Sequence, residues 1–272
     1  MPAKTGLVEV MDRAARKAGS RLRRDFGEVE HLQVSKKGPA DFVSKADQKA
    51  ERVLYDELLH ARPDWGFLLE EGGEIPGEED KPRWVIDPLD GTTNFLHGIP
   101  HFAISIGVQE RKLDGSGWGD VYAALVYQPI NDEVFWAEKA KGAYLGDRRL
   151  RVSGRRHMDE SLIATGTPFL GHGDVEEWTK INNAIAPKVA GIRRFGAASL
   201  DLAWLAAGRF DGFWESDLQA WDTAAGGLLV REAGGFVTDF KGRSPAIADK
   251  QILAANDALH SKLHKLLAGA LR

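Results

Sequence analysis

The amino-acid sequence predicts a mixed protein in which an antiparallel α+β first half is followed by an α/β second half. In the first half, two amphipathic helical stretches precede a series of short apolar runs that are separated by turns. From about residue 160, strand-like and helical stretches alternate instead, which is typical of an α/β arrangement. We therefore expect one compact unit whose two halves span residues 1–150 and 151–272.

The first half opens with two predicted helices. Residues 7–26 carry apolar side chains at helical spacing, and a second helix begins near Asp47 and ends before Pro63, whose ring cannot continue it. The acid-rich and glycine-rich stretch 70–82 predicts a loop. Apolar runs then predict four strands, at residues 83–86, 102–108, 121–127 and 133–137.

In the second half, short apolar runs predict strands and longer periodic stretches predict helices. The strands are expected at residues 162–165, 210–214 and 252–255. The helices are expected at residues 175–189, 199–207 and 223–233, followed by a terminal amphipathic helix from Leu259.

Composition excludes several classes of function. With 272 residues, 43% of them hydrophobic, the chain is long enough to bury a sizeable core. A formal net charge of −4 gives no electrostatic reason to expect nucleic acid or an anionic membrane as a partner. Since the chain has no cysteine, it forms no disulfide or thiolate metal site, and a reducing cytoplasm is its expected location. We also expect no signal peptide and no membrane span, because no apolar stretch approaches roughly 20 residues.

The most informative segment is Asp87-Pro88-Leu89-Asp90-Gly91-Thr92-Thr93-Asn94-Phe95. A buried strand is expected to deliver Asp87 at its carboxyl end, the edge where open sheets collect ligands. Gly91 lets the backbone turn, and both Asp90 and Thr92 are good helix N-caps. The segment therefore predicts two carboxylates beside the free N–H groups of a turn or helix start, a place that also binds phosphate.

Carboxylates that share one space repel each other and stay ionised together only with cations between them. Oxygen ligands without histidine or cysteine favour hard ions, above all magnesium when a phosphate completes its shell. A second segment repeats the pattern, because a strand and a polar loop lead to Asp222 at a helix start. Glu70-Glu71 and the segment from Asp41 to Asp47 add further acidic residues. Taken singly, each acid is more simply a helix cap or a solvated loop residue.

Two other interpretations are excluded. An aspartate-nucleophile phosphatase of the haloacid dehalogenase type needs an aspartate where this chain has Pro88. His97 and His101 stand four residues apart, but Gly98 and Pro100 forbid the helix that a zinc pair of this spacing uses. We therefore expect both histidines to be loop or packing residues.

Together, these segments resemble the inositol monophosphatase family. Residues 87–95 match its first signature and Trp221-Asp222-Thr223-Ala224-Ala225-Gly226 matches its second, with the two other acidic segments in the expected order. The resemblance covers nearly the whole chain. It implies a layered αβαβα sandwich, a homodimer, and lithium-sensitive hydrolysis of a phosphate monoester by direct attack of water, with two or three Mg²⁺ ions per active site.

The resemblance also implies a metal-binding role for five residues. Glu70, Asp87 and the Leu89 carbonyl would hold the first metal ion. Asp87, Asp90 and Asp222 would hold a second, more weakly bound one.

Further roles follow from the same match. Thr92, oriented by Asp47, would help Glu70 activate the attacking water. The backbone N–H groups of Gly91 and Thr92 would bind the phosphate. The hydroxyl groups of the substrate would be bound by Asp90, Ala198 and Glu215.

Thr93-Asn94-Phe95 resembles the inositol branch of the superfamily, so myo-inositol 1-phosphate is the expected substrate. Fructose-1,6-bisphosphatases, nucleotide 3′,5′-bisphosphatases and histidinol-phosphate phosphatases share the metal ligands and are the alternatives within the superfamily. A regulatory module that binds a protein partner and keeps residual phosphatase activity is an alternative of another class. A panel of these substrates with magnesium separates the alternatives.

Overall fold

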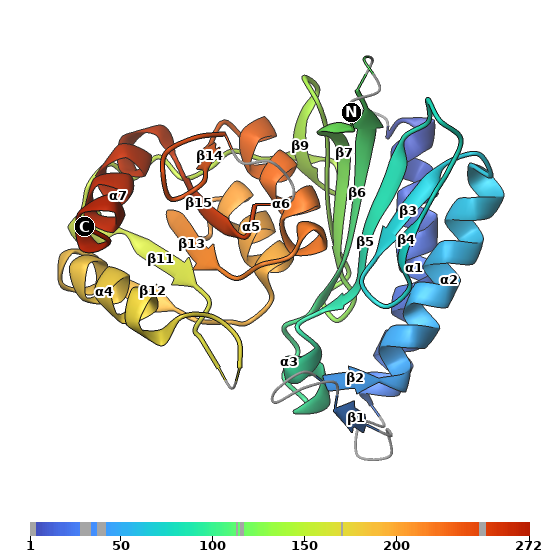
Figure 1. The fold of residues 1–272 in the computed structure, drawn as a ribbon, viewed down its shortest axis with the longest axis horizontal. Helices are drawn as coiled ribbons and strands as arrows, with labels where there is room; N and C mark the ends of the chain where they lie inside the picture. Colours follow the sequence, from blue (N-terminus) through green and yellow to red (C-terminus); the bar gives the residue numbers. More distant parts are fainter. Residues whose placement is uncertain are drawn as a thin grey trace.

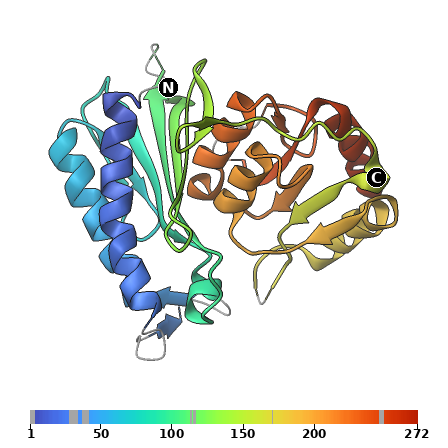
Figure 2. The same ribbon diagram turned by 180° about the vertical axis from the view of Figure 1, so that it is seen from behind.

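Two large β-sheets stand in layers, with helices between them and outside them (Figure 1). The structure is a computed structural model that describes residues 4–27, 34–36, 42–112, 114, 117–169, 171–244 and 249–272. Helices α1 (Gly6–Phe26) and α2 (Lys45–Ala61) cover the outer face of the larger sheet. Between the sheets lie α5 (Ala198–Ala206) and α6 (Ala220–Glu232), and the far side of the smaller sheet is covered by α4 (Val175–Ile185) and α7 (Asp257–Ala270) (Figure 2). The αβαβα sandwich that the resemblance implies is confirmed.

The larger sheet has eight strands in the order β10-β9-β8-β7-β6-β5-β3-β4. The β3–β5 pair is parallel and the other neighbouring pairs are antiparallel. Its strands are β3 (Gly66–Leu69), β4 (Gly73–Ile75), β5 (Arg83–Asp90), β6 (Ala103–Arg111), β7 (Trp118–Gln128), β8 (Glu133–Glu138), β9 (Gly142–Leu145) and β10 (Arg148–Arg149). The short helix α3 (Thr92–Leu96) follows β5, and a separate two-stranded pair joins β1 (Val34–Lys36) to β2 (Phe42–Ser44).

The smaller sheet has five strands in the order β12-β11-β13-β15-β14. Its central strand β13 runs parallel to β11 and antiparallel to β15, so the sheet is mixed. The strands are β11 (Leu162–Thr165), β12 (Gly191–Arg193), β13 (Gly212–Ser216), β14 (Phe236–Thr238) and β15 (Gln251–Ala255). The last strand of the larger sheet ends at Arg149 and the first of the smaller begins at Leu162; the division of the chain at residue 150 stays a prediction.

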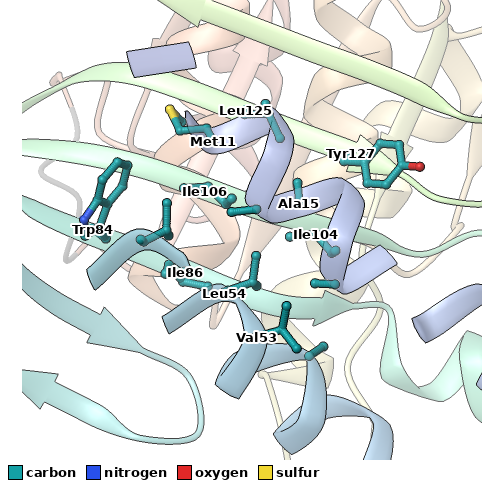
Figure 3. Packing of buried hydrophobic residues seen from close by; sticks show 14 of the residues in the cluster. Met11, Ala15, Val53, Leu54, Trp84, Ile86, Ile104, Ile106, Leu125 and Tyr127 are labelled. Carbon is teal, nitrogen blue, oxygen red and sulfur yellow. The ribbon is translucent and has the colours of Figure 1, made fainter. Parts of the chain in front are cut away.

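The larger sheet and its two outer helices share one hydrophobic core (Figure 3). Leu54, Trp84 and Ile86 are fully buried in it, and each such side chain contributes about 1.5–3 kcal/mol through its burial. Helix α1 approaches the sheet closely at Gly19, where an added Cβ would lie 2.5 Å from the Tyr127 ring. This packing holds β5, whose carboxyl end carries Asp87 and Asp90, in the middle of a rigid sheet.

The middle layer is formed by α5 and α6, which are apolar on nearly all sides, as expected of helices covered by sheets on both sides. Helix α6 packs against β6 and β7 on one side and against β14 and β15 on the other. The two helices touch at Gly226, where an added Cβ would lie 2.5 Å from the Cβ of Leu202. Because α5 begins at Ala198 and α6 carries Asp222 in its first turn, this contact fixes the separation of two predicted site residues.

Three sequence predictions need correction. The stretch 70–82 is not one continuous loop, because the chain turns at Gly73 (φ +72°) and β4 then pairs with the open edge of β3. Strand β5 does not stop at Ile86 but continues through Pro88 to Asp90, with an irregular register between Asp87 and Asp90. The helix predicted to reach residue 189 ends at Ile185, and a 3-10 turn that contains Pro187 (Ala186–Lys188) follows it.

Among the described residues, no helix combines the length and the apolar character that crossing a bilayer requires.

Replacing Gly226 by alanine tests the contact between α5 and α6. We expect Gly226→Ala to lower the stability by about 1–3 kcal/mol, because the added methyl group must push Leu202 aside in a packed layer. The measurement is the midpoint of urea unfolding, compared with that of the unchanged protein. Gly269→Ala is the matched control: Gly269 also lies in a helix but has open space around it, so alanine there should raise stability by about 0.5–1 kcal/mol. Equal midpoints for the two variants would contradict the tight crossing.

Candidate functional site

The predicted site residues gather in one pocket between the two sheets. The carboxyl end of β5, the start of α3, the starts of α5 and α6 and the end of β13 meet there. The pocket has a volume of about 420 Å³, and its walls include Glu70, Asp90, Gly91, Thr92, Ala198, Glu215 and Asp222. The three remaining predicted residues, Asp47, Asp87 and Leu89, are buried. Segments from both halves of the chain therefore build the site.

The turn that follows β5 has the geometry that the sequence predicts. Gly91 precedes α3 with φ +90°, a conformation that disfavours any side chain, and a Cβ there would lie 3.0 Å from the carbonyl oxygen of His101. The Asp87 carboxylate accepts a hydrogen bond from the Leu89 N–H at 2.9 Å. The Thr92 hydroxyl donates to the Leu89 carbonyl at 3.0 Å. These bonds keep a carboxylate, a carbonyl and a hydroxyl together at the start of α3.

The acidic side chains are close enough to disfavour one another's ionisation. Burial, followed by the charge of Asp47, raises the pKa of Glu70 to about 8, although a hydrogen bond with Asp87 acts in the opposite direction. Burial and then the charges of Glu70, Asp90 and Asp222 raise the pKa of Asp87 well above its usual range. Since the charge of Asp47 raises the pKa of Glu70, Asp47 belongs to the same electrostatic unit as Glu70, Asp87, Asp90 and Asp222.

Asp90 and Asp222 are held by hydrogen bonds from the helices of the middle layer. Burial is the main reason that the pKa of Asp90 is raised, and the N–H and hydroxyl of Ser199, at 2.7 and 2.5 Å, oppose that rise. Asp222 is the third residue of α6, and its carboxylate accepts the Gln219 N–H at 2.7 Å. Burial and then the charge of Asp90 raise the pKa of Asp222. Both carboxylates are thus positioned by the start of a helix.

The donor set fits a hard divalent cation in its chemistry. It consists of carboxylates and one backbone carbonyl, which are the ligands that Mg²⁺ prefers, and a cation would remove the mutual repulsion. Within the described ranges, however, no three His, Cys, Asp or Glu side chains already converge as a metal centre. Their carboxyl oxygens instead bond to protein groups such as Ser199 and the Gln219 N–H.

Glu215 also lines the pocket and lies near the carboxyl end of β13. Burial, with the charges of Asp201, Asp222 and Asp90, raises its pKa well above the usual range, and Arg194 acts in the opposite direction. A Cβ on Gly166 would lie 1.8 Å from the Glu215 carboxylate, so β11 leaves room for this acid only because position 166 is glycine.

Several residues that support the site were not singled out from the sequence. Ser199 binds Asp90, as described above. The Asn94 side chain donates to the carbonyl oxygens of His101 and Phe195, both at 2.7 Å, and so ties α3 to the middle layer. His101 is buried and contacts Asp201 at 3.2 Å, which confirms that it is a packing residue. The available signal was Asn94 directly before the apolar pair Phe95-Leu96, because an amide that becomes buried there requires hydrogen-bond partners. Asp41 lies outside the described residues.

Sequence comparisons connect the chain to known proteins. A model of the inositol monophosphatase family matches residues 5–272. The inositol-1-monophosphatase of Rhizobium meliloti is 52% identical over 265 residues, which cover 97% of each chain. The protein named Nus factor SuhB in Escherichia coli is 42% identical, over 92% of this chain and 91% of its own length.

Solved structures show the same similarity in three dimensions. The extragenic suppressor protein suhB from Bartonella henselae superposes with a TM-score of 0.91 at 52% identity, covering 97% of this chain and 98% of its own. An IMPase from Thermotoga maritima superposes with a TM-score of 0.86 at 32% identity, covering 98% of each chain.

The raised carboxyl pKa values predict that stability falls as pH rises when metal ions are removed. The pKa of Glu70 is about 8 in the folded chain and ordinarily 4.5. Between these two pH values the unfolded chain has released the proton that the folded chain still holds, so the free energy of unfolding falls as the pH rises. In EDTA, the melting temperature should therefore be higher at about pH 5 than at about pH 8. Added MgCl₂ should raise it more at the higher pH, because only ionised carboxylates attract the cation.

Glu70→Gln should flatten this pH dependence, since the amide does not titrate. Glu78→Gln, which removes an exposed acid of the same loop region, is the control and should leave the pH dependence unchanged. If the melting temperature of Glu70→Gln depends on pH as steeply as that of the unchanged protein, Glu70 does not titrate in this range.

Proposed function

This chain belongs to the inositol monophosphatase family and is a phosphoric monoester hydrolase, and we propose that it hydrolyses myo-inositol 1-phosphate to inositol and phosphate with Mg²⁺ as its cofactor. The observation that supports this most is the union of Glu70, Asp87, Asp90 and Asp222 in one electrostatic unit beside the Gly91 turn. Such a site attracts cations when empty of substrate and, once they are bound, attracts a phosphate dianion.

We assign the metal-binding role to the carboxylate unit. Glu70, Asp87 and the Leu89 carbonyl would hold one ion, Asp87, Asp90 and Asp222 a second, and a third ion is compatible with the same acids. Bound Mg²⁺ would neutralise the charge of the phosphate, lower the pKa of a bound water and stabilise the leaving oxygen. The family is generally metal-dependent; the identity of the metal and the number of ions belong to this proposal.

The protein groups around the turn would position the reactants. The N–H groups of Gly91 and Thr92 would donate to the phosphate at the start of α3. The Thr92 hydroxyl, fixed beside the Leu89 carbonyl, would orient the attacking water together with Glu70 acting as base. The buried Asp47 adds a negative charge that raises the proton affinity of Glu70 and so suits that role.

The opposite side of the pocket would bind the alcohol part of the substrate. Glu215 and Asp90 can accept hydrogen bonds from hydroxyl groups, and Ala198 lies at the start of α5 between them in the pocket wall. Because the charge of Arg194 partly balances Glu215, a neutral polyol suits this end better than a second anion does.

The comparisons favour this function over the alternatives. Identity is 52% with the relative named inositol-1-monophosphatase and 42% with the one named Nus factor SuhB, so a role through a protein partner is the second candidate. The fructose-1,6-bisphosphatase, nucleotide 3′,5′-bisphosphatase and histidinol-phosphate phosphatase activities are separated by rates on the corresponding substrates.

We also propose that the protein is a cytoplasmic homodimer. Ile99 is a large apolar side chain that is 48% exposed, and it lies two residues before His101, whose ring stacks on Phe195. An exposed apolar residue close in the chain to such an aromatic pair suits contact with a second copy. The lack of cysteine suits a reducing compartment.

Metal removal should abolish hydrolysis. We expect EDTA to eliminate activity on inositol 1-phosphate and excess MgCl₂ to restore it, because the reaction needs a cation between the carboxylates and the phosphate. Asp90→Asn should lower kcat at saturating MgCl₂ by at least about a hundredfold. Asp159→Asn, which changes an exposed aspartate outside the pocket, is the control, and far-UV circular dichroism should be the same for both. Near-normal turnover by Asp90→Asn would disprove the assigned site.

Lithium should inhibit the enzyme. Li⁺ is a small, hard cation that the same oxygen donors accept, and we expect it to act on the substrate-bound form rather than to exclude substrate. Initial rates over a range of inositol 1-phosphate and Li⁺ concentrations should therefore show uncompetitive inhibition. Inhibition that high substrate relieves would contradict this expectation.

Glu215 should affect substrate choice more than catalysis. We expect Glu215→Gln to lower kcat/KM for inositol 1-phosphate about tenfold, the effect of about 1.4 kcal/mol, because a charged acceptor of hydroxyl hydrogen bonds is lost. Hydrolysis of p-nitrophenyl phosphate, which has no polyol hydroxyls, and activation by magnesium should stay nearly unchanged. An equal loss on both substrates would place Glu215 in the catalytic or structural framework.

A further inference from the structure

The loop between β11 and α4 forms one wall of the pocket and ends in a stacked aromatic pair. The rings of Phe169 and His172 lie 4.9 Å apart between centroids, with an angle of 26° between their planes. Two backbone hydrogen bonds join these residues, Phe169 N–H to His172 O at 3.1 Å and the reverse at 2.7 Å. Both side chains line the pocket. The pair is therefore a small, locally braced aromatic surface at the candidate site.

This loop is anchored at both of its ends. At the first end, Trp178 of α4 donates its indole N–H to the carbonyl of Gly166 at 2.7 Å. At the second, the Gly173 N–H donates to the carboxylate of Asp217, in the segment between β13 and α6, at 2.8 Å. Asp217 adopts φ +65° there, so the segment itself has a defined turn. These bonds hold the aromatic pair against the end of the pocket that contains Glu215.

The aromatic surface has no packing role that explains its exposure. Phe169 is 47% exposed, and among the exposed large hydrophobic side chains of the described residues it is the one that lines the pocket. Exposed apolar surface beside polar groups in a concave site is typical of a ligand contact. The carboxylates of Glu215 and Asp90 in the same pocket accept hydrogen bonds and do not recognise the apolar part of a substrate, whereas the exposed ring of Phe169 offers it an apolar face.

A cyclic polyol has complementary surfaces. Its hydroxyls project mainly from the rim of the ring, where carboxylates and backbone groups can bind them, and its faces carry C–H bonds. Aromatic faces are electron-rich and attract the weakly positive hydrogens of such C–H groups. An acyclic polyol has no rigid face of this kind and gains little from a flat aromatic surface.

We propose that Phe169 and His172 form a platform on which the ring of a cyclic polyol phosphate lies, so that the enzyme selects cyclic over acyclic phosphate monoesters. This proposal rests on the proposed function, since it concerns the leaving-group side of the same pocket. Phe169 and His172 act as specificity residues, and the carboxylate unit at the opposite wall carries out the chemistry on either type of substrate.

The test compares Phe169→Ala and the unchanged enzyme on inositol 1-phosphate and on the acyclic glycerol 2-phosphate, at saturating MgCl₂. We expect KM for inositol 1-phosphate to rise about tenfold, the size of one aromatic contact, with kcat within about twofold, because a platform binds ground state and transition state alike. The kinetic parameters for glycerol 2-phosphate should change by less than about twofold. Phe169→Tyr keeps an aromatic face and should retain the KM of the unchanged enzyme.

Phe236→Ala provides a matched control. Phe236 on β14 is 50% exposed and also lies beside a histidine ring, that of His260, but it does not line the pocket. Its removal should leave both substrates unaffected, and equal melting temperatures would show that all variants fold.

Three outcomes would overturn the platform. One is an unchanged KM for inositol 1-phosphate in Phe169→Ala, with the unchanged enzyme active; this leaves the proposed function intact. Another is an equal loss of kcat/KM in Phe169→Ala on inositol 1-phosphate and on glycerol 2-phosphate. The third is a loss of kcat/KM in Phe169→Ala that is confined to a nucleoside monophosphate such as adenosine 2′-monophosphate. That result would show that the platform binds a nucleobase and not a polyol ring. If the unchanged enzyme with MgCl₂ does not hydrolyse inositol 1-phosphate at all, the proposed function itself fails.

Discussion

Repulsion among buried carboxylates is the constraint on which the rest of this structure depends. Glu70, the Asp87–Asp90 segment and Asp222 come from three separate parts of the chain, and the charges of Glu70, Asp90 and Asp222 each raise the pKa of at least one other of these acids. A fold that brings them together without a cation must hold them in place against their own electrostatics. Packing of the scaffold offsets this repulsion, because β5 is buried along its whole length and α6 lies between two sheets. The larger hydrophobic core is therefore needed to maintain a locally unfavourable arrangement.

The middle layer positions individual carboxylate groups through hydrogen bonds and close helix packing. Ser199 holds Asp90 from the start of α5, the Gln219 N–H holds Asp222 at the start of α6, and Gly226 sets the distance between the two helices. Asn94 adds a third link, between α3 and the segment before α5. The bonds of Ser199 to Asp90 and of Asn94 to Phe195 join residues 1–150 to residues 151–272, so neither part contains the whole candidate site. We infer that the site and the association of the two sheets form together on folding.

The parts of the structure that the sequence predicts well are those governed by local chemistry. Apolar periodicity predicted α1 closely, and Gly91 indicated the turn between β5 and α3. The strand at Gly73–Ile75 was missed because its composition is that of a loop, and it forms only because β3 offers a free edge. Contacts between segments that are distant in the sequence could not be predicted from it either. Neither the bond from Ser199 to Asp90 nor the space that Gly166 leaves for Glu215 has a signature in local sequence.

The two sides of the pocket obey different physical rules, and this separates chemistry from selectivity. On the carboxylate side, removal of one charge alters the balance of the whole unit, so little variation is compatible with activity. In the proposed roles, the Phe169–His172 pair would contact the leaving group through its ring faces, with a modest energy and without a charge of the carboxylate unit, whereas the pKa of Glu215 is raised by Asp222 and Asp90. The β11–α4 loop is anchored by Trp178 and Asp217, neither of which belongs to the carboxylate unit. Under the proposed assignment, substitutions in this loop would alter which leaving group fits while leaving the carboxylate unit in place, and one fold could in this way serve phosphatases with different substrates.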